Sequence, residues 1–347
     1  MKFRLLLYIT ILAITGGCNS APKKKAATVS PAFYHWKTEF APTQSEWNTI
    51  HKNHVKELYV RFFDVAWDNN SNQPSPIAQL RVADKTIFAR QAVSVIPTVF
   101  ITNECIKNIR PEQCKQLARN IFKLISSIAV VNTIDAIKEI QVDCDWTAAT
   151  RDKYFSLLTE LQKIDTQHLY SATIRLFQVK YKNETGVPPV KKGLLMCYNM
   201  GNLKDPATRN SILDPATLKR YTGNLRDYPL ALDVALPLFS WYVLFRGNEY
   251  KGLLQQVDED LLKNTITRPG KNSLEIIKDS TWKNISFKKG DLLRFEHASY
   301  EDILRAAEII KEKLPHSPFR LSLYHLDSIT LSKYSAHEME AIFRSLH

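Results

Sequence analysis

Near the middle of the chain, one segment reads Glu139-Ile140-Gln141-Val142-Asp143-Cys144-Asp145-Trp146. Its apolar and β-branched residues predict a strand, in which successive side chains point to opposite faces. One face then carries Gln141, Asp143 and Asp145, and the other carries Ile140, Val142 and Cys144. In a barrel, the polar set points into the lumen and the apolar set packs under the surrounding helices.

Seven further runs of short, apolar or aromatic sequence accompany this one. The eight runs are 32–40, 57–65, 93–101, 138–145, 169–177, 193–200, 230–239 and 319–326. Helical patterns lie between them, among them 111–128, 147–162 and 299–314. Several runs are apolar on successive residues, as is typical of parallel strands covered by helices. We therefore predict an α/β fold, a (β/α)8 TIM barrel over residues 32–347, with a doubly wound open sheet as the alternative.

The interval between the last two predicted strands is too long for a single crossover. It contains the turn signals Arg268-Pro269-Gly270 and Lys288-Lys289-Gly290-Asp291. We predict an insertion at about residues 247–298, between strands 7 and 8, which forms one wall of a cleft.

The N-terminus has the order of a secretory signal. Two positive charges in residues 1–4 precede an apolar run at 5–14 and small residues before Cys18. The run is too short to span a bilayer of about 30 Å. Because small residues before a cysteine resemble a bacterial lipoprotein processing site, we predict a signal peptide at 1–17, a lipid on Cys18 and a flexible tether at 18–31. The alternative is an ordinary signal peptide in which Cys18 is incidental.

Such a lipid predicts anchoring to a membrane of the bacterial cell envelope. The composition is globular, with 47 Lys and Arg against 35 Asp and Glu, a net charge of +12. The cations are interspersed with carboxylates, which argues against a nucleic-acid partner. No glycine-rich phosphate loop, C-x-x-C or H-E-x-x-H spacing occurs, so we predict no cofactor and no metal site, and we expect a monomer.

Cysteines take different predicted roles after export. Cys105 and Cys114 flank a polar, turn-prone segment, and an oxidising compartment favours a disulfide between them. Cys144 and Cys197 lie in apolar runs, where a free cysteine behaves as a small hydrophobe.

Polar and aromatic side chains gather where the predicted strands end, and a TIM barrel has its active site at that face. They are Glu39, Asp64, Trp67, Asn103, Asp143, Asp145, Trp146, Arg175, Gln178, Tyr198, Asn199, Trp241, Tyr242, His325 and Asp327. Each alone also fits a structural role, such as a helix cap. Two inward carboxylates two residues apart, about 7 Å, repel each other and predict a raised pKa suited to acid–base chemistry. The alternative is a buried Asp that accepts hydrogen bonds from backbone amides.

Two segments resemble glycoside hydrolase family 18, the chitinases and endo-N-acetylglucosaminidases. That family carries Asp-x-x-Asp-x-Asp-x-Glu on strand 4 and Met-x-Tyr-Asp or Met-x-Tyr-Asn on strand 6. The similar segments here are Asp143-Cys144-Asp145-Trp146 and Met196-Cys197-Tyr198-Asn199. The resemblance implies that Asp145 orients the substrate acetamido group and that Tyr198 binds the acetamide during substrate-assisted cleavage.

The resemblance fails at two positions. Thr147 stands where the family has its general-acid Glu, and Ile140 stands where it has the first Asp. A threonine cannot protonate a glycosidic oxygen at neutral pH. The wider run Gln141-x-Asp143-x-Asp145, with Arg151 and Tyr154 on the following helix, is also similar to an uncharacterised bacterial family of predicted glycosidase-like lipoproteins.

Aromatic residues near the same face suit a sugar, because flat rings stack on pyranose faces while polar groups bond the hydroxyls. The predicted substrate contacts are Trp36, Trp67, Gln141, Trp146, Asn199, Trp241, Tyr242 and His325. Two functions remain open. One is a glycoside hydrolase in which Asp143 or Asp145 works with Glu39 or Asp64; the other is a catalytically inactive barrel that binds a glycan.

Overall fold

The computed structural model describes residues 28–255, 257, 267–269, 273–282, 284–314 and 318–346. The predicted signal peptide, Cys18 and the tether up to residue 27 lie outside this described part. Within it, no helix combines the length and apolar character needed to cross a membrane. The first strand begins at Val29, which pairs with Phe319, so residues 29–31 belong to the barrel and not to the tether.

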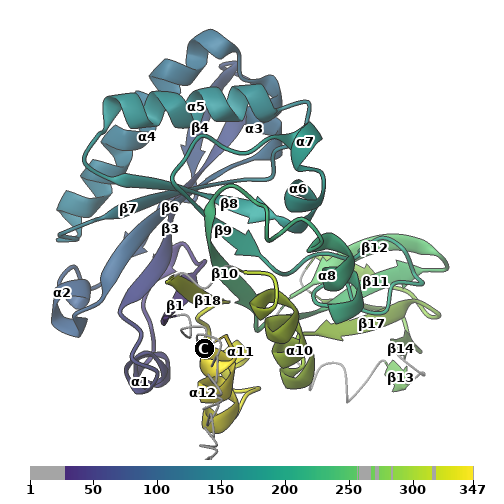
Figure 1. Cartoon of the computed structure of the whole chain (residues 1–347). Coiled ribbons are helices and arrows are strands. Elements are labelled where there is room, and N and C mark those ends of the chain that lie inside the picture. Colours follow the sequence, from purple (N-terminus) through teal and green to yellow (C-terminus); the bar gives the residue numbers. More distant parts are fainter. Residues whose placement is uncertain are drawn as a thin grey trace, which may run out of the picture.

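Eight parallel strands close into a barrel (Figure 1). They are β1 (Val29–His35), β3 (Glu57–Asp68), β6 (Ser94–Ile101), β7 (Glu139–Cys144), β8 (Leu169–Arg175), β9 (Lys192–Met196), β10 (Ala231–Pro237) and β18 (Phe319–Tyr324). Their hydrogen-bonded order is β1-β18-β10-β9-β8-β7-β6-β3, and pairing of β1 with β3 closes the ring. The predicted TIM barrel is therefore confirmed, and the open sheet is excluded.

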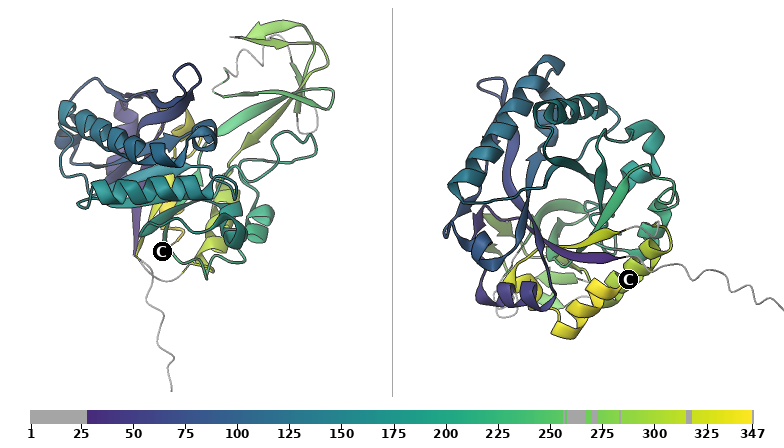
Figure 2. Two further views of the ribbon diagram at one scale, coloured as in Figure 1. Left: turned by 90° about the horizontal axis from the view of Figure 1, so that it is seen from above. Right: turned by 60° about the vertical axis from the view of Figure 1, so that its left-hand side comes forward.

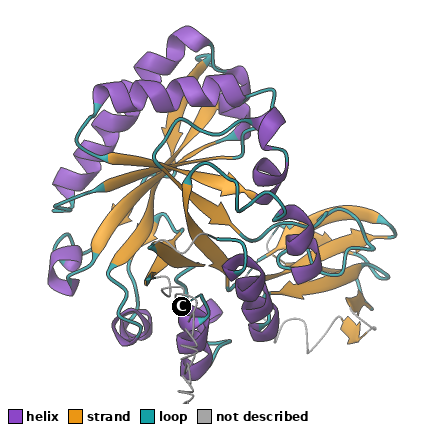
Figure 3. Ribbon diagram, viewed as in Figure 1, coloured by secondary structure: helices purple, strands orange, loops and turns teal. Residues whose placement is uncertain are grey.

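Helices surround the ring of strands (Figure 3). They are α1 (Gln44–Lys52), α2 (Ile87–Gln91), α3 (Asn103–Asn108), α4 (Pro111–Val131), α5 (Arg151–Ile164), α6 (Leu176–Lys180), α7 (Lys182–Thr185), α8 (Pro215–Tyr221), α10 (Tyr300–Lys311), α11 (Ser328–Leu331) and α12 (Ala336–Arg344). The outer face of β7 packs under α5, where the Tyr154 hydroxyl donates to the Val142 carbonyl at 2.9 Å. Three short strands complete this part: β2 (Glu39–Phe40) pairs with β5 (Arg81–Val82), and β4 (Gln73–Ile77) pairs with β3.

Helix α10 shows how local sequence begins an element. Ser299 is its N-cap, and its hydroxyl accepts a hydrogen bond from the Asp302 backbone N–H at 3.1 Å. The apolar face of the helix, with Ile303, Ala307 and Ile310, is buried.

Replacing this cap tests the role of the serine. We expect Ser299→Ala to lower the free energy of unfolding by about 1 kcal/mol, because one N-terminal amide loses its partner. Urea unfolding of both proteins measures this. A Ser299→Asp variant keeps an acceptor and serves as the control, and equal stability of the Ala variant and the unsubstituted chain would contradict the assignment.

The insertion between β10 and β18 is a second sheet that projects from one side of the barrel (Figure 2, left). Its strands run in the order β12 (Glu249–Leu254), β11 (Ser240–Arg246), β17 (Leu292–His297), β14 (Ser273–Ile276) and β13 (Thr267–Pro269), beside the hairpin β15 (Ser280–Trp282) and β16 (Ile285–Phe287). It has a small core of its own, formed by Leu244, Leu254, Ile276, Phe287 and Leu293. Because β11 and β17 pair from Ser240 to His297, the insertion begins earlier than the predicted residue 247.

A cluster of charges fills the barrel at the amino-terminal ends of the strands. Arg320 donates to Glu57 at 2.6 Å, to Glu139 at 2.6 Å and to Asp233 at 3.0 Å. Lys192 pairs with Asp233 at 2.7 Å. This cluster lies at the end of the barrel opposite the carboxyl ends of the strands.

The predicted disulfide is wrong, because Cys105 and Cys114 are free and buried thiols. Cys105 is on α3, and Cys114 is on α4, where its thiol lies near the carbonyls of Arg110 and Lys153. Burial raises the pKa of Cys105 to about 12. Cys144 and Cys197 are free and buried, as expected.

Candidate functional site

A cavity of about 530 Å³ opens at the carboxyl ends of the barrel strands. Seven aromatic residues line it, and all lie on barrel or insertion strands or shortly after them. They are Tyr34 from β1, Trp36 after β1, Phe100 from β6, Tyr198 after β9, Phe239 after β10, Trp241 from β11 and Tyr324 from β18. Tyr198 and Tyr324 have ring centroids 5.2 Å apart, and Phe239 and Trp241 have theirs 5.2 Å apart. Four charged side chains, Lys37, Asp143, Asp145 and Arg175, also line the cavity. Its other polar lining residues are Asn199, Ser240, Gln255, His325 and Thr330.

The carboxylates reach this cavity because of the strand register. Asp143 of β7 lies opposite Phe100 of β6, and both line the cavity. Two residues earlier on the same inner face, Gln141 accepts a hydrogen bond from the Tyr34 hydroxyl. The alternation predicted for this strand is therefore confirmed.

Asp145 is held by Arg175, the last residue of β8. The guanidinium donates from Nε to Oδ1 at 2.5 Å and from Nη2 to Oδ2 at 3.0 Å. A two-point ion pair of this kind fixes the position of the carboxylate. The carboxylate of Asp145 therefore lines the cavity in a fixed position, as one half of an ion pair with Arg175.

Asp143 has a different environment. Burial, and next the charge of Asp145, raise the pKa of Asp143 to about 7. The Thr173 hydroxyl donates to its Oδ1 at 2.6 Å. A carboxyl that is partly protonated at neutral pH both donates and accepts hydrogen bonds, as the repulsion between the two inward carboxylates predicts.

Tyr198 offers a polar atom with no partner. Its side chain is buried, it lines the cavity, and its hydroxyl makes no hydrogen bond with any residue that the structure describes. A buried hydroxyl without a partner carries a desolvation cost, which a ligand group would remove.

The other rim of the cavity is formed by residues around the end of β18. Lys37 pairs with Asp327 at 2.5 Å, and the partly buried His325 lies beside them. Burial lowers the pKa of His325, so its ring is neutral at pH 7. Both cations of the cavity lining, Lys37 and Arg175, are therefore already paired with carboxylates.

The structure brings seven of the predicted site residues together. Those that line the cavity are Trp36, Asp143, Asp145, Tyr198, Asn199, Trp241 and His325. Gln141 lies just below, bonded to Tyr34. Among the described residues, no group of three or more His, Cys, Asp or Glu side chains is arranged to hold a metal ion.

Contrary to the prediction, neither of the two carboxylates expected to assist Asp143 or Asp145 lines the cavity. Glu39 is exposed on β2, opposite Arg81 of β5. Asp64 is buried on the inner face, but both of its oxygens are bonded to Arg61. An irregularity in the pairing of β3 with β6 between Arg61 and Phe63 turns Arg61 to the same face as Asp64, and this makes the pair possible.

Three predicted aromatic contacts are also outside the cavity. Trp146 is fully buried against Tyr154, and its indole N–H donates to the Thr185 carbonyl at 2.9 Å. Trp67 packs against the core near the end of β3, opposite Pro74 of β4. Tyr242 faces the other side of the insertion sheet, with its ring 4.9 Å from that of Phe295.

Thr147 does not take the place of a proton donor. It is exposed in the turn before α5, where its backbone N–H donates to the Thr150 hydroxyl at 2.9 Å, and it is not among the residues lining the cavity.

Sequence reasoning missed Arg175 as the partner of Asp145, and Phe100, Phe239 and Tyr324 as wall residues. The sequence did indicate that these residues could lie near the site, because each is in a predicted strand run or at its end. What the sequence lacked was the register that brings these ends together.

The closed barrel, its insertion between strands 7 and 8 and this cavity define a (β/α)8 TIM barrel with a cavity at the carboxyl ends of its strands. No protein-family model matches the chain, and no curated protein matches it. Solved structures do match, among them a chitinase from Bacteroides thetaiotaomicron, with a TM-score of 0.56, 12% identity and coverage of 92% of this chain and 97% of that one. The spore cortex-lytic enzyme SleL of Bacillus cereus matches with a TM-score of 0.53 at 15% identity, over 94% of this chain and 76% of the enzyme. At this identity the likeness establishes the fold.

Proposed function

We propose that this protein binds a glycan that contains N-acetylhexosamine, in the aromatic cavity at the carboxyl ends of the barrel strands. The observation that carries the proposal is the combination of an aromatic wall with the unpartnered hydroxyl of Tyr198. Rings such as Tyr324 and Trp241 suit the apolar faces of a sugar, and the Tyr198 hydroxyl suits its acetamide. The names of the structural neighbours, chitinases and a cortex-lytic enzyme, support a ligand of this class.

The absence of a second suitable carboxylate favours binding over cleavage. Of the described residues that line the cavity, only Asp143 and Asp145 are carboxylates, and Asp145 is paired with Arg175. A conventional acid and base on opposite sides of a glycosidic bond are therefore missing from this lining.

A second candidate function is hydrolysis, and the raised pKa of Asp143, about 7, favours it. In this case the neutral Asp143 carboxyl gives its proton to the leaving glycosidic oxygen. The acetamide oxygen of the substrate attacks the anomeric carbon, and water then opens the resulting cyclic intermediate. Asp143, not the residue at position 147, is the acid in this scheme.

We further propose that a lipid on Cys18 anchors the protein to a membrane of the bacterial cell envelope. Mass spectrometry of the membrane fraction tests this. A diacylglyceryl group on Cys18, and its loss in a Cys18→Ala variant that leaves the membrane, are the expected results; an unmodified chain that begins elsewhere would refute the anchor.

Glycan binding is tested with an array and a hydrolysis screen, using the protein from residue 19 onward and its Tyr198→Phe variant. We expect the variant to bind its glycan at least about tenfold more weakly, because it loses one hydrogen bond to a buried polar group. We also expect equal or greater thermal stability, since the hydroxyl has no described partner to lose.

The array and screen separate the candidates. Binding without turnover supports the lectin-like function, and turnover supports hydrolysis. A native protein that binds no N-acetylhexosamine glycan, or a Tyr198→Phe variant that binds as well as the native protein, would contradict the proposed site. Asp152→Asn, on the exposed surface of α5, is the matched control.

A further inference from the structure

A buried charged pair joins the insertion sheet to the wall of the cavity. Arg294 and Glu296 both lie on β17, with 7% and 1% of their surface exposed. The Arg294 Nε donates to the Glu296 Oε1 at 2.7 Å. Removing two charges from water is costly, and apolar residues often replace such a pair without loss of stability. Stability alone therefore does not explain why this buried ion pair is present.

The second oxygen of Glu296 faces the cavity wall. Its Oε2 accepts a hydrogen bond from the Trp241 indole N–H at 2.7 Å and one from the Ser211 backbone N–H at 3.0 Å. The Ser211 hydroxyl donates to the same oxygen. Trp241 lies opposite Glu296 in the β11–β17 pairing, and its ring lines the cavity. One carboxylate oxygen thus fixes the orientation of a wall residue.

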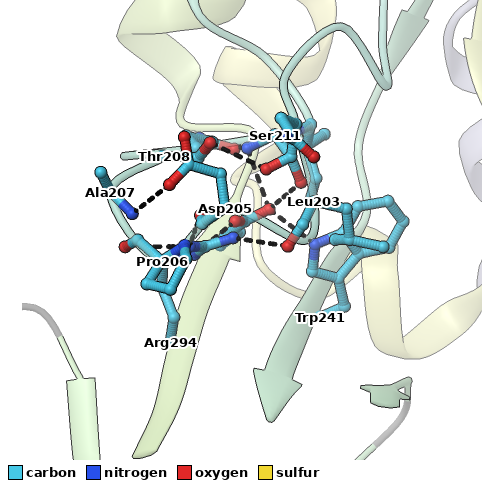
Figure 4. Close-up of polar contacts among 12 residues, drawn as sticks. Leu203, Asp205, Pro206, Ala207, Thr208, Ser211, Trp241 and Arg294 are labelled. Carbon is cyan, nitrogen blue, oxygen red and sulfur yellow. Dashed lines mark hydrogen bonds and ion pairs between the residues drawn. The ribbon is translucent and has the colours of Figure 1, made fainter. Parts of the chain in front are cut away.

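Arg294 holds the neighbouring loop, which connects β9 to α8 (Figure 4). Its guanidinium donates to the carbonyls of Leu203 at 3.1 Å, Asp205 at 2.7 Å and Pro206 at 3.2 Å. The loop is folded tightly there, since a Cβ on Gly201 would lie 2.8 Å from the Cα of Ser211. The same loop carries Asn199 into the cavity.

We propose that Glu296 is a positioning residue for glycan binding, which orients the Trp241 ring from the insertion sheet while Arg294 fixes the loop that carries Asn199. This inference rests on the proposed function of the cavity. A ring that is held in place before the ligand arrives loses little conformational freedom on binding, so the affinity is higher. Glu296 itself does not line the cavity, and it acts only through Trp241 and the loop.

A matched pair of double variants tests the role of the carboxylate oxygen. Single removal of either charge would leave the other buried and unpaired, so both are removed together. R294M/E296Q keeps an oxygen that accepts from the Trp241 indole, and R294M/E296M does not. Both variants lose the Arg294 contacts to the loop equally, so their difference isolates the oxygen.

We expect both double variants to fold, and we expect R294M/E296M to unfold at a lower temperature than R294M/E296Q, because three buried donors lose their acceptor. We expect R294M/E296M to bind the glycan about tenfold more weakly than R294M/E296Q, roughly the effect of one hydrogen bond. In nuclear magnetic resonance spectra, the Trp241 indole N–H should exchange with solvent more slowly in the Gln variant than in the Met variant. Equal glycan affinities in folded proteins would overturn the proposal.

The exchange measurement needs no ligand, so it distinguishes two kinds of failure. If the native protein binds no glycan, the proposed function fails, and equal indole exchange in the two variants would then overturn the positioning role as well. Slower exchange in the Gln variant would still support the orientation of Trp241 by residue 296. If the native protein binds a glycan but the two variants do not differ, only the positioning role fails.

Discussion

Replacing Arg320 with Met will destabilise the barrel by about 3–5 kcal/mol, the largest effect that we expect from a single substitution. The guanidinium bonds to three carboxylates at the amino-terminal end of the barrel, Glu57, Glu139 and Asp233. Lys192 remains for Asp233, but Glu139 has no other described partner, and one of its oxygens is already without a hydrogen bond. The variant therefore leaves a buried negative charge uncompensated.

Urea unfolding of the native protein and the Arg320→Met variant measures this loss. The control is Arg344→Met, which breaks an exposed pair with Glu340 on α12. It should change the free energy of unfolding by less than about 0.5 kcal/mol. Equal effects of the two substitutions would show that the cluster around Arg320 is not the stabilising element inferred here.

Asp143→Asn is expected to remove a pH dependence of stability. The pKa of Asp143 is raised to about 7 by burial and by Asp145, whereas an unfolded aspartate has a pKa of about 3.9. Between these values the folded state holds a proton that the unfolded state releases. This group therefore contributes stability at low pH that is lost as the pH rises towards 7, by about 1.4 kcal/mol per pH unit.

The Asn side chain has nearly the same shape and keeps an oxygen for the Thr173 hydroxyl. We expect the variant to be more stable than the native protein at pH 8, with the difference shrinking towards pH 4. Urea unfolding at several pH values between 4 and 8 gives the free energy of unfolding as a function of pH for the native protein and for the variant. Parallel slopes would contradict the raised pKa, and Asp152→Asn, at a side chain that is 84% exposed, is the control.

The same variant bears on the function. If Asp143 is the proton donor of a hydrolase, turnover of any glycan that the screen identifies will fall by about 10²–10⁴-fold. If the protein only binds glycans, Asp143→Asn alters affinity, and there is no turnover to lose. A variant that gains stability but loses function is expected where a functional residue, here the buried carboxyl of Asp143, lowers the stability of the folded protein.

Much of the barrel followed from local patterns. Each of the eight predicted strand runs overlaps an observed barrel strand, since short apolar runs between capped helices carry the signal of parallel strands in each segment separately. Strand alternation also placed Asp143 and Asp145 on one inner face. These features depend on neighbours in the chain, so one sequence suffices to predict them.

The partners of these residues depend on contacts between distant segments. The pairing of Arg175 with Asp145 spans two strands, and the irregularity at Phe62 that joins Arg61 to Asp64 has no signature in the spacing of the residues. Trp146 was predicted to contact the ligand because it follows Asp145 in the sequence. In the structure it packs under α5, against Tyr154. The position of Trp146 next to Asp145 in the sequence did not show whether its side chain points into the cavity or towards the surrounding helices.

The sequence by itself therefore determined the class of fold, the face of the barrel where the cavity lies and the two inward carboxylates. The tertiary structure alone decided which charges neutralise one another, which aromatic rings form the wall, and that Cys105 and Cys114 remain free thiols. The physical reason is that side-chain periodicity is a local property of the backbone. Ion pairing, ring packing and desolvation depend on which residues the closed barrel brings within a few ångströms of each other.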